Sequence, residues 1–260
     1  MNIFVFVKRV PDTESKIRID HETNSVIEEG LNFVINPYDE YAVEEALRLR
    51  EANGGTVTVF SVGPDEAIPI LKKVLAMGAD EAVLLKDDVP ETYDALRTAR
   101  IIAGALKTKY SDYNLLLFGK QSVGADNSQV PSMVAEFMGL PQVNVVTKLE
   151  IDRNTGIAHR EIEGAVEKVS FALPAVIGAQ KGLNEPRYET LKGIMAAKRK
   201  EIPVVPIQEL GLGEKQLVPQ LELTRLESPA PREAGKVIEE EPEAAAKKMV
   251  EYLREEAKVI

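Results

Sequence analysis

The fold is decided by residues 113–130, which read Tyr113-Asn114-Leu115-Leu116-Leu117-Phe118 and then Gly119-Lys120-Gln121-Ser122-Val123-Gly124-Ala125-Asp126-Asn127-Ser128-Gln129-Val130. The apolar run predicts a buried strand, and Pro131 suits the first turn of a helix over residues 131–138. Free backbone N–H groups and the helix dipole favour a phosphate at such a helix start. The stretch predicts either a phosphate-binding loop or an ordinary polar loop before a well-capped helix.

The chain before this stretch alternates between strand and helix patterns. Strands are expected over residues 2–7, 56–62 and 81–85, and helices over residues 39–52, 67–77 and 92–107. Such alternation predicts a doubly wound, mostly parallel sheet with helices on both faces, the Rossmann-like α/β class. Open sheets of this class bind ligands at the carboxyl ends of their strands, which favours the phosphate-binding interpretation.

The pattern changes after Pro141. Residues 143–151, 157–163, 167–171 and 175–179 look like strands joined by short turns, so we expect antiparallel strands that extend the same sheet. From Ile202 the chain is rich in proline and acidic residues, and it ends in an amphipathic helix over residues 242–258. We therefore expect a nucleotide-binding α/β domain over residues 1–200. Residues 201–260 would form an extended arm and a helix that either wrap a partner or pack back on the domain.

Composition excludes several classes of protein. The 260 residues include no cysteine, so disulfides, thiolate nucleophiles and iron–sulfur clusters are excluded, and the isolated His21 and His159 make a histidine metal site improbable. A formal net charge of −10 argues against nucleic-acid binding. Because no apolar run is long enough to span a bilayer and residues 1–7 resemble a strand, not a signal peptide, we expect a cytoplasmic protein outside the membrane. No residue is a good candidate for a catalytic acid or base.

Two further loops are expected at the same edge of the sheet as residues 119–130. They contain Asn36-Pro37-Tyr38-Asp39 and Val62-Gly63-Pro64. The three loops together would frame one site. The main loop matches neither the Walker pattern nor the dinucleotide fingerprint, because its only glycines are Gly119 and Gly124.

Several blocks of sequence follow one another along the chain and carry a resemblance to a known family. They are Val7-Lys8-Arg9-Val10, Asn36-Pro37 with Ala42-Val43-Glu44-Glu45-Ala46, Gly63-Pro64, Leu75-Ala76-Met77-Gly78-Ala79-Asp80, Gly119-Lys120-Gln121, Leu173-Pro174-Ala175-Val176 and Leu183-Asn184-Glu185-Pro186-Arg187-Tyr188. With them the chain resembles the β subunit of electron-transfer flavoprotein (ETF) over essentially its whole length. Several blocks in order are more specific than any single glycine motif.

This resemblance implies a heterodimer with an ETF α subunit, around which the arm would wrap. The α subunit would hold most of a redox-active FAD, and this chain would hold AMP as a structural nucleotide. The complex would be an electron carrier and not an enzyme, taking electrons from acyl-CoA dehydrogenase-type flavoenzymes towards a membrane ETF:quinone oxidoreductase-type acceptor. Carried over to this sequence, the cofactor-binding residues are Phe6, Val7, Asn36, Pro37, Tyr38, Asp39, Val62, Gly63, Gly119, Gln121, Ser122, Val123, Gly124, Asp126, Asn127, Ser128, Gln129 and Val130.

The resemblance also implies a loop that docks on the dehydrogenase. Its residues are Arg187, Tyr188, Glu189, Thr190 and Leu191, with Leu191 at the position of the family's partner-anchoring leucine. An exposed leucine suits an apolar pocket on a partner, and Arg187 with the basic residues after it would add electrostatic steering. The alternative is that Leu191 only begins a helix packed on the domain.

Three other interpretations stay open. Pro11-Asp12-Thr13 and residues 36–39 look like the electron-bifurcating branch of the family, whose β subunit binds a second FAD in place of AMP, whereas residues 184–188 look like the non-bifurcating branch. A stand-alone ATP-binding regulatory α/β protein would need more glycines and a magnesium-binding acid, and residues 119–130 offer only Asp126. The third is a purely structural subunit with a vestigial nucleotide.

Overall fold

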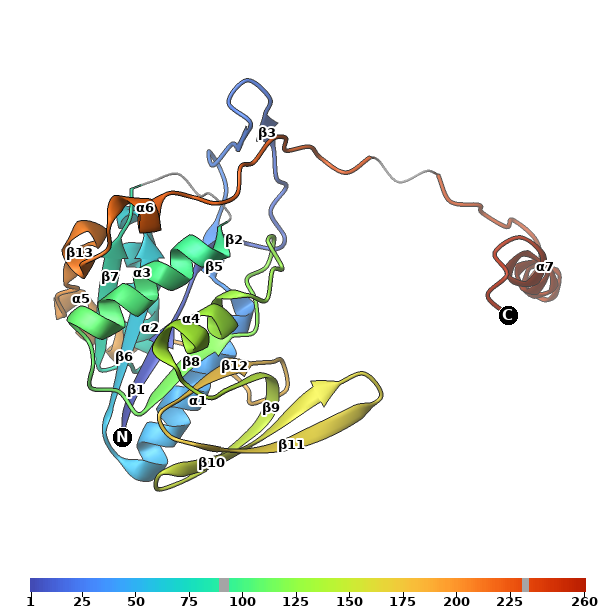
Figure 1. Cartoon of the computed structure of the whole chain (residues 1–260). Helices are drawn as coiled ribbons and strands as arrows, with labels where there is room; N and C mark the ends of the chain where they lie inside the picture. Colours follow the sequence, from blue (N-terminus) through green and yellow to red (C-terminus); the bar gives the residue numbers. More distant parts are fainter. Residues whose placement is uncertain (89–93, 231–233) are drawn as a thin grey trace. The chain divides into compact units, whose positions relative to one another are not determined.

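The computed structural model describes residues 1–88, 94–230 and 234–260, which form two compact units, Met1–Leu226 and Glu227–Ile260. The first unit is a sheet with helices on both faces (Figure 1). Within the described residues the sheet has nine strands in the order β11-β10-β9-β12-β8-β1-β6-β7-β13. The predicted doubly wound α/β class is confirmed.

The sheet from β12 to the edge strand β13 is parallel and contains the point where the strand order reverses. Its strands are β1 (Asn2–Phe6), β6 (Thr56–Gly63), β7 (Glu81–Lys86), β8 (Leu115–Gly119), β12 (Ala175–Ala179) and β13 (Val204–Pro206). The chain adds β6 and β7 on one side of β1 and then places β8 on the other, so that Phe6 lies opposite both Phe60 and Phe118. Open α/β sheets bind ligands at the carboxyl ends of the strands beside such a reversal.

The helices of this unit divide the core into two layers. They are α1 (Pro37–Asn53), η1 (Asp65–Ala67), α2 (Ile68–Met77), α3 (Ala95–Thr108) and α4 (Val130–Met138). Because successive strand residues point to opposite faces, Val5 packs in the core with α1 and α2, whereas Phe6 packs with α3 and α4. The start expected for α3, residues 92–93, lies outside the described residues.

The strands after α4 extend the sheet as a projecting antiparallel ribbon. They are β9 (Gln142–Asp152), β10 (Thr155–Ile162) and β11 (Ala165–Ala172), each antiparallel to the next as predicted. The expectation that Ala175–Ala179 is also antiparallel is wrong, because β12 returns between β8 and β9 and runs parallel to both. All five of its residues are buried, which is typical of a central parallel strand.

Several short elements were not expected from the sequence. They are β2 (Arg9–Pro11) paired with β5 (Phe33–Ile35), β3 (Ile19–Asp20) paired with β4 (Ser25–Val26), η2 (Ile207–Leu210) and α6 (Glu214–Leu217). Helix α5 (Leu191–Arg199) begins at Leu191, as the alternative interpretation of the docking loop expected. The chain after Ile202 is not extended throughout, because β13 pairs with β7 and both Ile207 and Leu210 are buried. Apolar side chains at these positions pack in the core despite the neighbouring prolines.

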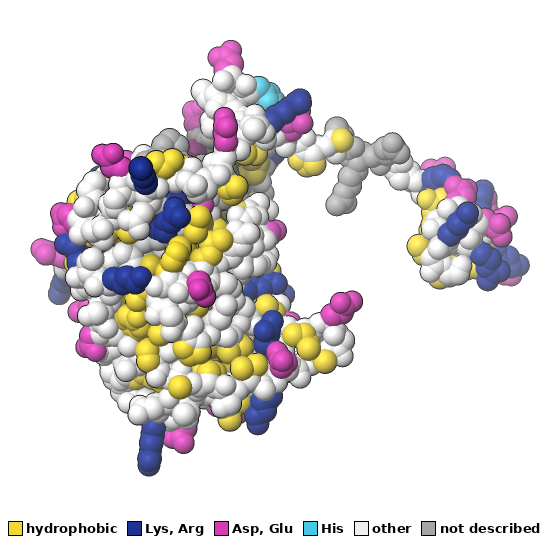
Figure 2. All heavy atoms as spheres, in the orientation of Figure 1, with side chains coloured by type: hydrophobic (Ala, Val, Ile, Leu, Met, Phe, Trp, Pro, Cys, Tyr) yellow, Lys and Arg dark blue, Asp and Glu magenta, His cyan; other side chains and the backbone are white. Residues whose placement is uncertain are grey.

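The second unit contains α7 (Pro242–Glu255), close to the predicted range of 242–258, and none of its residues is buried within the described chain. Over the described residues, no helix combines the length and the apolar character needed to cross a membrane. On the face of the chain shown in Figure 2, Lys and Arg side chains are interspersed with Asp and Glu. The cytoplasmic location stays a prediction.

Candidate nucleotide site and docking loop

A cavity of about 340 Å³ opens at the carboxyl ends of β1, β6 and β8, where the strand order reverses. It brings together the predicted residues Phe6, Val7, Asn36, Asp39, Val62, Gly63, Gly119, Gln121, Ser122, Asn127, Ser128, Gln129 and Val130. The other predicted residues, which lie outside the lining, are Pro37, Tyr38, Val123, Gly124 and Asp126. The three loops expected to frame one site therefore do meet.

The start of α1 fixes the loop after β8. Asn36 is 1 % exposed, and its Nδ2 donates to the Gln121 carbonyl (2.8 Å) while its Oδ1 accepts from the Val123 N–H (3.1 Å). The same Nδ2 donates to Asp39 Oδ1 (2.9 Å). Asn36 thus replaces the backbone partners that this part of the loop lacks, and holds it against α1.

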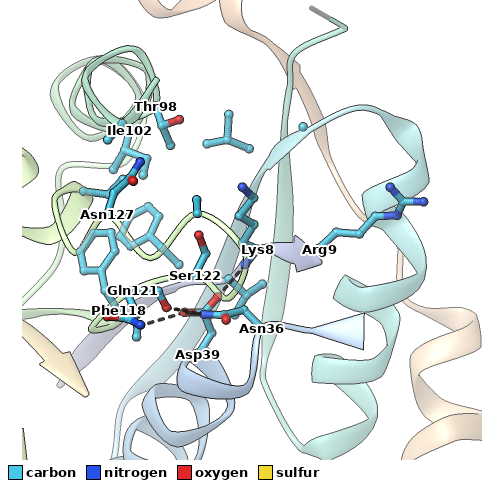
Figure 3. A pocket seen from close by; sticks show the side chains of 18 of the residues that line it. Lys8, Arg9, Asn36, Asp39, Thr98, Ile102, Phe118, Gln121, Ser122 and Asn127 are labelled. Carbon is cyan, nitrogen blue, oxygen red and sulfur yellow. Dashed lines mark hydrogen bonds between the residues drawn. The ribbon is translucent and has the colours of Figure 1, made fainter. Parts of the chain in front are cut away.

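Asp39 joins the ends of the two central strands. Its carboxylate accepts from the Lys8 N–H after β1 (2.7 Å) and from the Gly119 N–H at the end of β8 (3.1 Å). Burial raises the pKa of Asp39 to about 7, although these bonds and the one from Asn36 favour the ionised form. The carboxyl group at the base of the site therefore titrates near neutral pH. Figure 3 shows hydrogen bonds of this carboxyl group.

Gly119 permits this close approach. A Cβ at this position would lie 2.3 Å from Asp39 Oδ1 and 2.7 Å from the Tyr38 carbonyl carbon, so no other residue fits without movement of α1. Beyond it, Gln121 Nε2 donates to Asp126 Oδ1 (2.6 Å) and Ser128 Oγ donates to Gln121 Oε1 (2.8 Å). These side chains stabilise the loop itself.

The first turn of α4 ends the loop at the cavity. Gln129, Val130 and Pro131 line the cavity, and within the described chain no side chain caps this helix. Backbone N–H groups in the first turn of a helix have no partner within the helix, and the helix dipole makes them favour an anion. The arrangement can bind a phosphate without a basic side chain.

Part of the opposite wall of the cavity is apolar, although the lining also includes Asp87, Asp94 and Arg97. The rings of Phe6 and Phe118 stack with centroids 4.5 Å apart, and Phe6 also stacks on Phe60 (5.3 Å). Figure 3 shows Thr98 and Ile102 on the α3 side, away from Lys8 and Asp39. A flat, mostly apolar group fits this wall, so the cavity offers different chemistry at its two ends.

The predicted docking loop lies on α1, away from the cavity lining. Arg187 donates from Nε to Glu44 Oε2 (2.7 Å) and from Nη1 to Glu51 Oε1 (2.6 Å), and these bonds raise its pKa. Tyr188 is 92 % exposed and Leu191 is 77 % exposed. Thr190 Oγ1 accepts from the Gly193 N–H (3.0 Å) and so caps α5. Glu189 lies in the sequence between the exposed Tyr188 and Leu191.

Comparison with known proteins agrees with this geometry. The family model for the electron transfer flavoprotein domain matches residues 23–210. The electron transfer flavoprotein subunit beta of Bacillus subtilis (strain 168) is 42 % identical over 262 residues, covering 100 % of each chain. The chain belongs to the electron transfer flavoprotein β-subunit family. The protein of the same name from Thermoanaerobacterium thermosaccharolyticum is 37 % identical, covering 97 % of this chain and 98 % of that relative. The one from Mycobacterium bovis is 39 % identical, covering 81 % of each chain.

As a member of this family, the chain is an electron-transfer flavoprotein subunit. The lining of its cavity also includes residues that the sequence analysis did not single out. Asp94 caps α3 by accepting from the Leu96 N–H (2.8 Å) and the Arg97 N–H (3.1 Å). Arg97 forms a fork-shaped ion pair with Asp87, and both side chains are 7 % exposed. The N-cap residue Asp94 before an apolar helix was a usable signal, whereas the pairing of Arg97 was visible only in the fold.

Proposed function

We propose that this chain is the β subunit of a heterodimeric ETF, binding an ETF α subunit and holding AMP in the cavity between α1, α3 and the loop over residues 119–130. The heterodimer carries electrons from acyl-CoA dehydrogenase-type flavoenzymes towards a membrane ETF:quinone oxidoreductase-type acceptor. The observation that carries the proposal is the uncapped start of α4 at the cavity, opposite an apolar wall. A mononucleotide has the matching pair of groups, a phosphate and a flat base.

The residues of this chain would hold AMP in two ways. The N–H groups in the first turn of α4 and the hydroxyl of Ser122 would bind the phosphate, while the wall that includes Phe118 and Ile102 would contact the base. The cavity of about 340 Å³ is at the small end of the range for ligand pockets, which supports a mononucleotide. AMP in this place would join β1, β8, α3 and α4, and so stabilise the domain.

The FAD, held mainly by the α subunit, supplies the electron uptake and release. This chain contributes position and electrostatics. Tyr38 lies outside the cavity lining, and Lys120 Nζ is 5.0 Å from the centre of its ring. We propose that Tyr38 contacts the flavin ring from the side of the β subunit.

The alternative within the family is a second FAD in the cavity, as in the electron-bifurcating branch. Co-expression with the α subunit, release of the nucleotides by heat and their count by mass spectrometry separate the two. One FAD and one AMP per heterodimer support the proposal. Two FAD and no AMP would replace it by bifurcation, and ATP turnover by the isolated chain would replace it by the ATP-binding regulatory class.

A further inference from the structure

We propose that Glu44 and Glu51 of α1 are positioning residues that act through Arg187 to hold the docking loop in the shape that meets the electron donor. The inference rests on the docking role proposed for residues 187–191. It adds to that role the residues that hold the loop.

The Arg187 guanidinium pairs with two carboxylates of α1. Its Nε and Nη2 donate to the two carboxylate oxygens of Glu44 (2.7 and 3.0 Å), and its Nη1 and Nη2 donate to those of Glu51 (2.6 and 3.2 Å). The Arg187 backbone N–H also donates to Glu44 Oε2 (3.1 Å). The planar guanidinium has donors in a fixed fork, so this double pairing sets both the direction of the side chain and the path of the backbone.

The burial of the partners makes this clamp specific. The Glu44 side chain is 6 % exposed and that of Arg187 is 32 % exposed. A carboxylate removed from water needs a hydrogen-bonded cation, and Arg187 supplies this to Glu44. Arg48 Nε lies 3.8 Å from Glu44 Oε1, so alternative positions of Arg187 leave Glu44 only this longer ion pair. Glu44 and Glu51 are seven residues apart, which places them on one face of α1.

The two ends of the loop are also fixed. Asn184 Nδ2 donates to the Tyr41 carbonyl (3.0 Å) and to Glu45 Oε2 (2.9 Å), so α1 holds the chain before Arg187 as well. After the loop, α5 lies close to α2, because a Cβ at Gly193 would be 2.1 Å from the Ala76 carbonyl oxygen. The backbone is held on both sides while the side chains between remain outside.

The loop backbone is thus held on α1, while the apolar side chains of the loop and of α5 stay exposed. Tyr188 and Leu191 keep 92 % and 77 % of their surface exposed, and Met195 on the next turn of α5 keeps 57 %. A loop that is ordered before binding loses less conformational entropy on binding, which tightens the complex without a new contact. Arg187 therefore acts on the donor by fixing the loop and not as a free surface charge.

The test uses the heterodimer with its flavin, with Glu44→Gln, Glu51→Gln and Arg187→Lys, and with Glu40→Gln as the matched control. Glu40 lies on the same helix and pairs with Lys73 (3.2 Å), not with the loop. We expect Glu44→Gln and Arg187→Lys to speed amide hydrogen exchange in residues 187–191. Both should raise the KM of an acyl-CoA dehydrogenase for the heterodimer by about tenfold at unchanged kcat and flavin content. Glu51→Gln should also speed the exchange and raise the KM, but by less. Glu40→Gln should change neither the exchange nor the KM.

Four results would overturn the inference. Unchanged exchange and KM in Glu44→Gln would show that the clamp does not hold the loop. Wild-type KM in Arg187→Lys would show that charge alone matters, since lysine keeps the charge and loses the fork. Faster exchange in Glu44→Gln with no rise in KM, while Leu191→Ala does raise it, would show that the donor tolerates a loose loop. If Leu191→Ala also leaves KM unchanged, the docking role itself fails, and the inference with it.

Discussion

Replacing Asn36 by alanine tests whether the start of α1 holds the nucleotide loop. The Asn36 side chain makes three hydrogen bonds within the described residues, to Asp39, to the Gln121 carbonyl and from the Val123 N–H, and Asn36 is 1 % exposed. Asn36→Ala removes all three and leaves the two loop groups without these partners. The loop should separate from α1, and the bound nucleotide should be lost with it.

The size of the effect follows from the bonds that are lost. Each is worth about 0.5–1.5 kcal/mol net, and a buried group left unpaired costs more, so the free energy of unfolding should fall by about 2–4 kcal/mol. For a unit of this size that change lowers the Tm by about 5–15 °C. Nucleotide binding should weaken by at least about tenfold, because the loop must now be ordered at the expense of binding.

The assay compares the Tm and the nucleotide content of the heterodimer in wild type, Asn36→Ala and the control Asn53→Ala. Asn53 is exposed at the end of α1, and its side chain makes one bond, to the Leu49 carbonyl (2.9 Å). The control should shift the Tm by less than about 2 °C. Full nucleotide occupancy and a wild-type Tm in Asn36→Ala would refute the role given to Asn36.

Three further substitutions test other parts of the structure. Gly119→Ala puts a Cβ 2.3 Å from Asp39 Oδ1 and should lower the Tm and the nucleotide content. A Cβ at Gly235 would meet no atom within 4 Å among the described residues other than its chain neighbours, so Gly235→Ala should change neither. Asp39 has its pKa raised from 3.8 to about 7, so the folded chain keeps a proton that the unfolded chain releases between these values. Its contribution to the free energy of unfolding therefore falls by up to about 4 kcal/mol as the pH rises from about 4 to about 7, and denaturant titrations of Asp39→Asn should lack this component. Leu191→Ala should slow electron uptake from an acyl-CoA dehydrogenase at unchanged flavin content and heterodimer stability, while the exposed Leu221→Ala should not; loss of flavin or of the partner subunit would make Leu191 a structural residue.

The parallel sheet could be predicted because each of its strands is apolar in its own sequence. Residues 3–7, 57–61 and 115–118 are buried and need no information about their partners. The direction of β12 could not be predicted in this way, since its five apolar residues suit either direction. The return of the chain between β8 and β9 decides it.

The cavity could be predicted in part, and the missing part has a physical reason. Loops at the carboxyl ends of parallel strands meet at one edge, which places Val62 and Gly119 together from strand positions alone. Asn36 follows β5, which pairs with β2 outside the main sheet, so its place at the start of α1 is visible only in the fold. The α3 wall depends on how far the helix lies over the sheet, so Thr98 and Ile102 carry no signal of their own. Val123 and Asp126 were expected to line the cavity, but the loop turns them elsewhere, the first onto Asn36 and the second onto Gln121.

Helix α1 shows how a sequence block can record a contact made far along the chain. Ala42, Val43 and Ala46 are fully buried, and the intervening Glu44 and Glu45 are only 4 % and 6 % exposed. Two adjacent carboxyl groups in such a helix are costly without partners, and burial raises the pKa of Glu45 even with the bond from Asn184. The pattern of acids among small apolar residues thus predicts partners elsewhere in the chain. Asn184 and Arg187 supply them more than 130 residues later, so the block at α1 and the block at the docking loop are two halves of one structural contact.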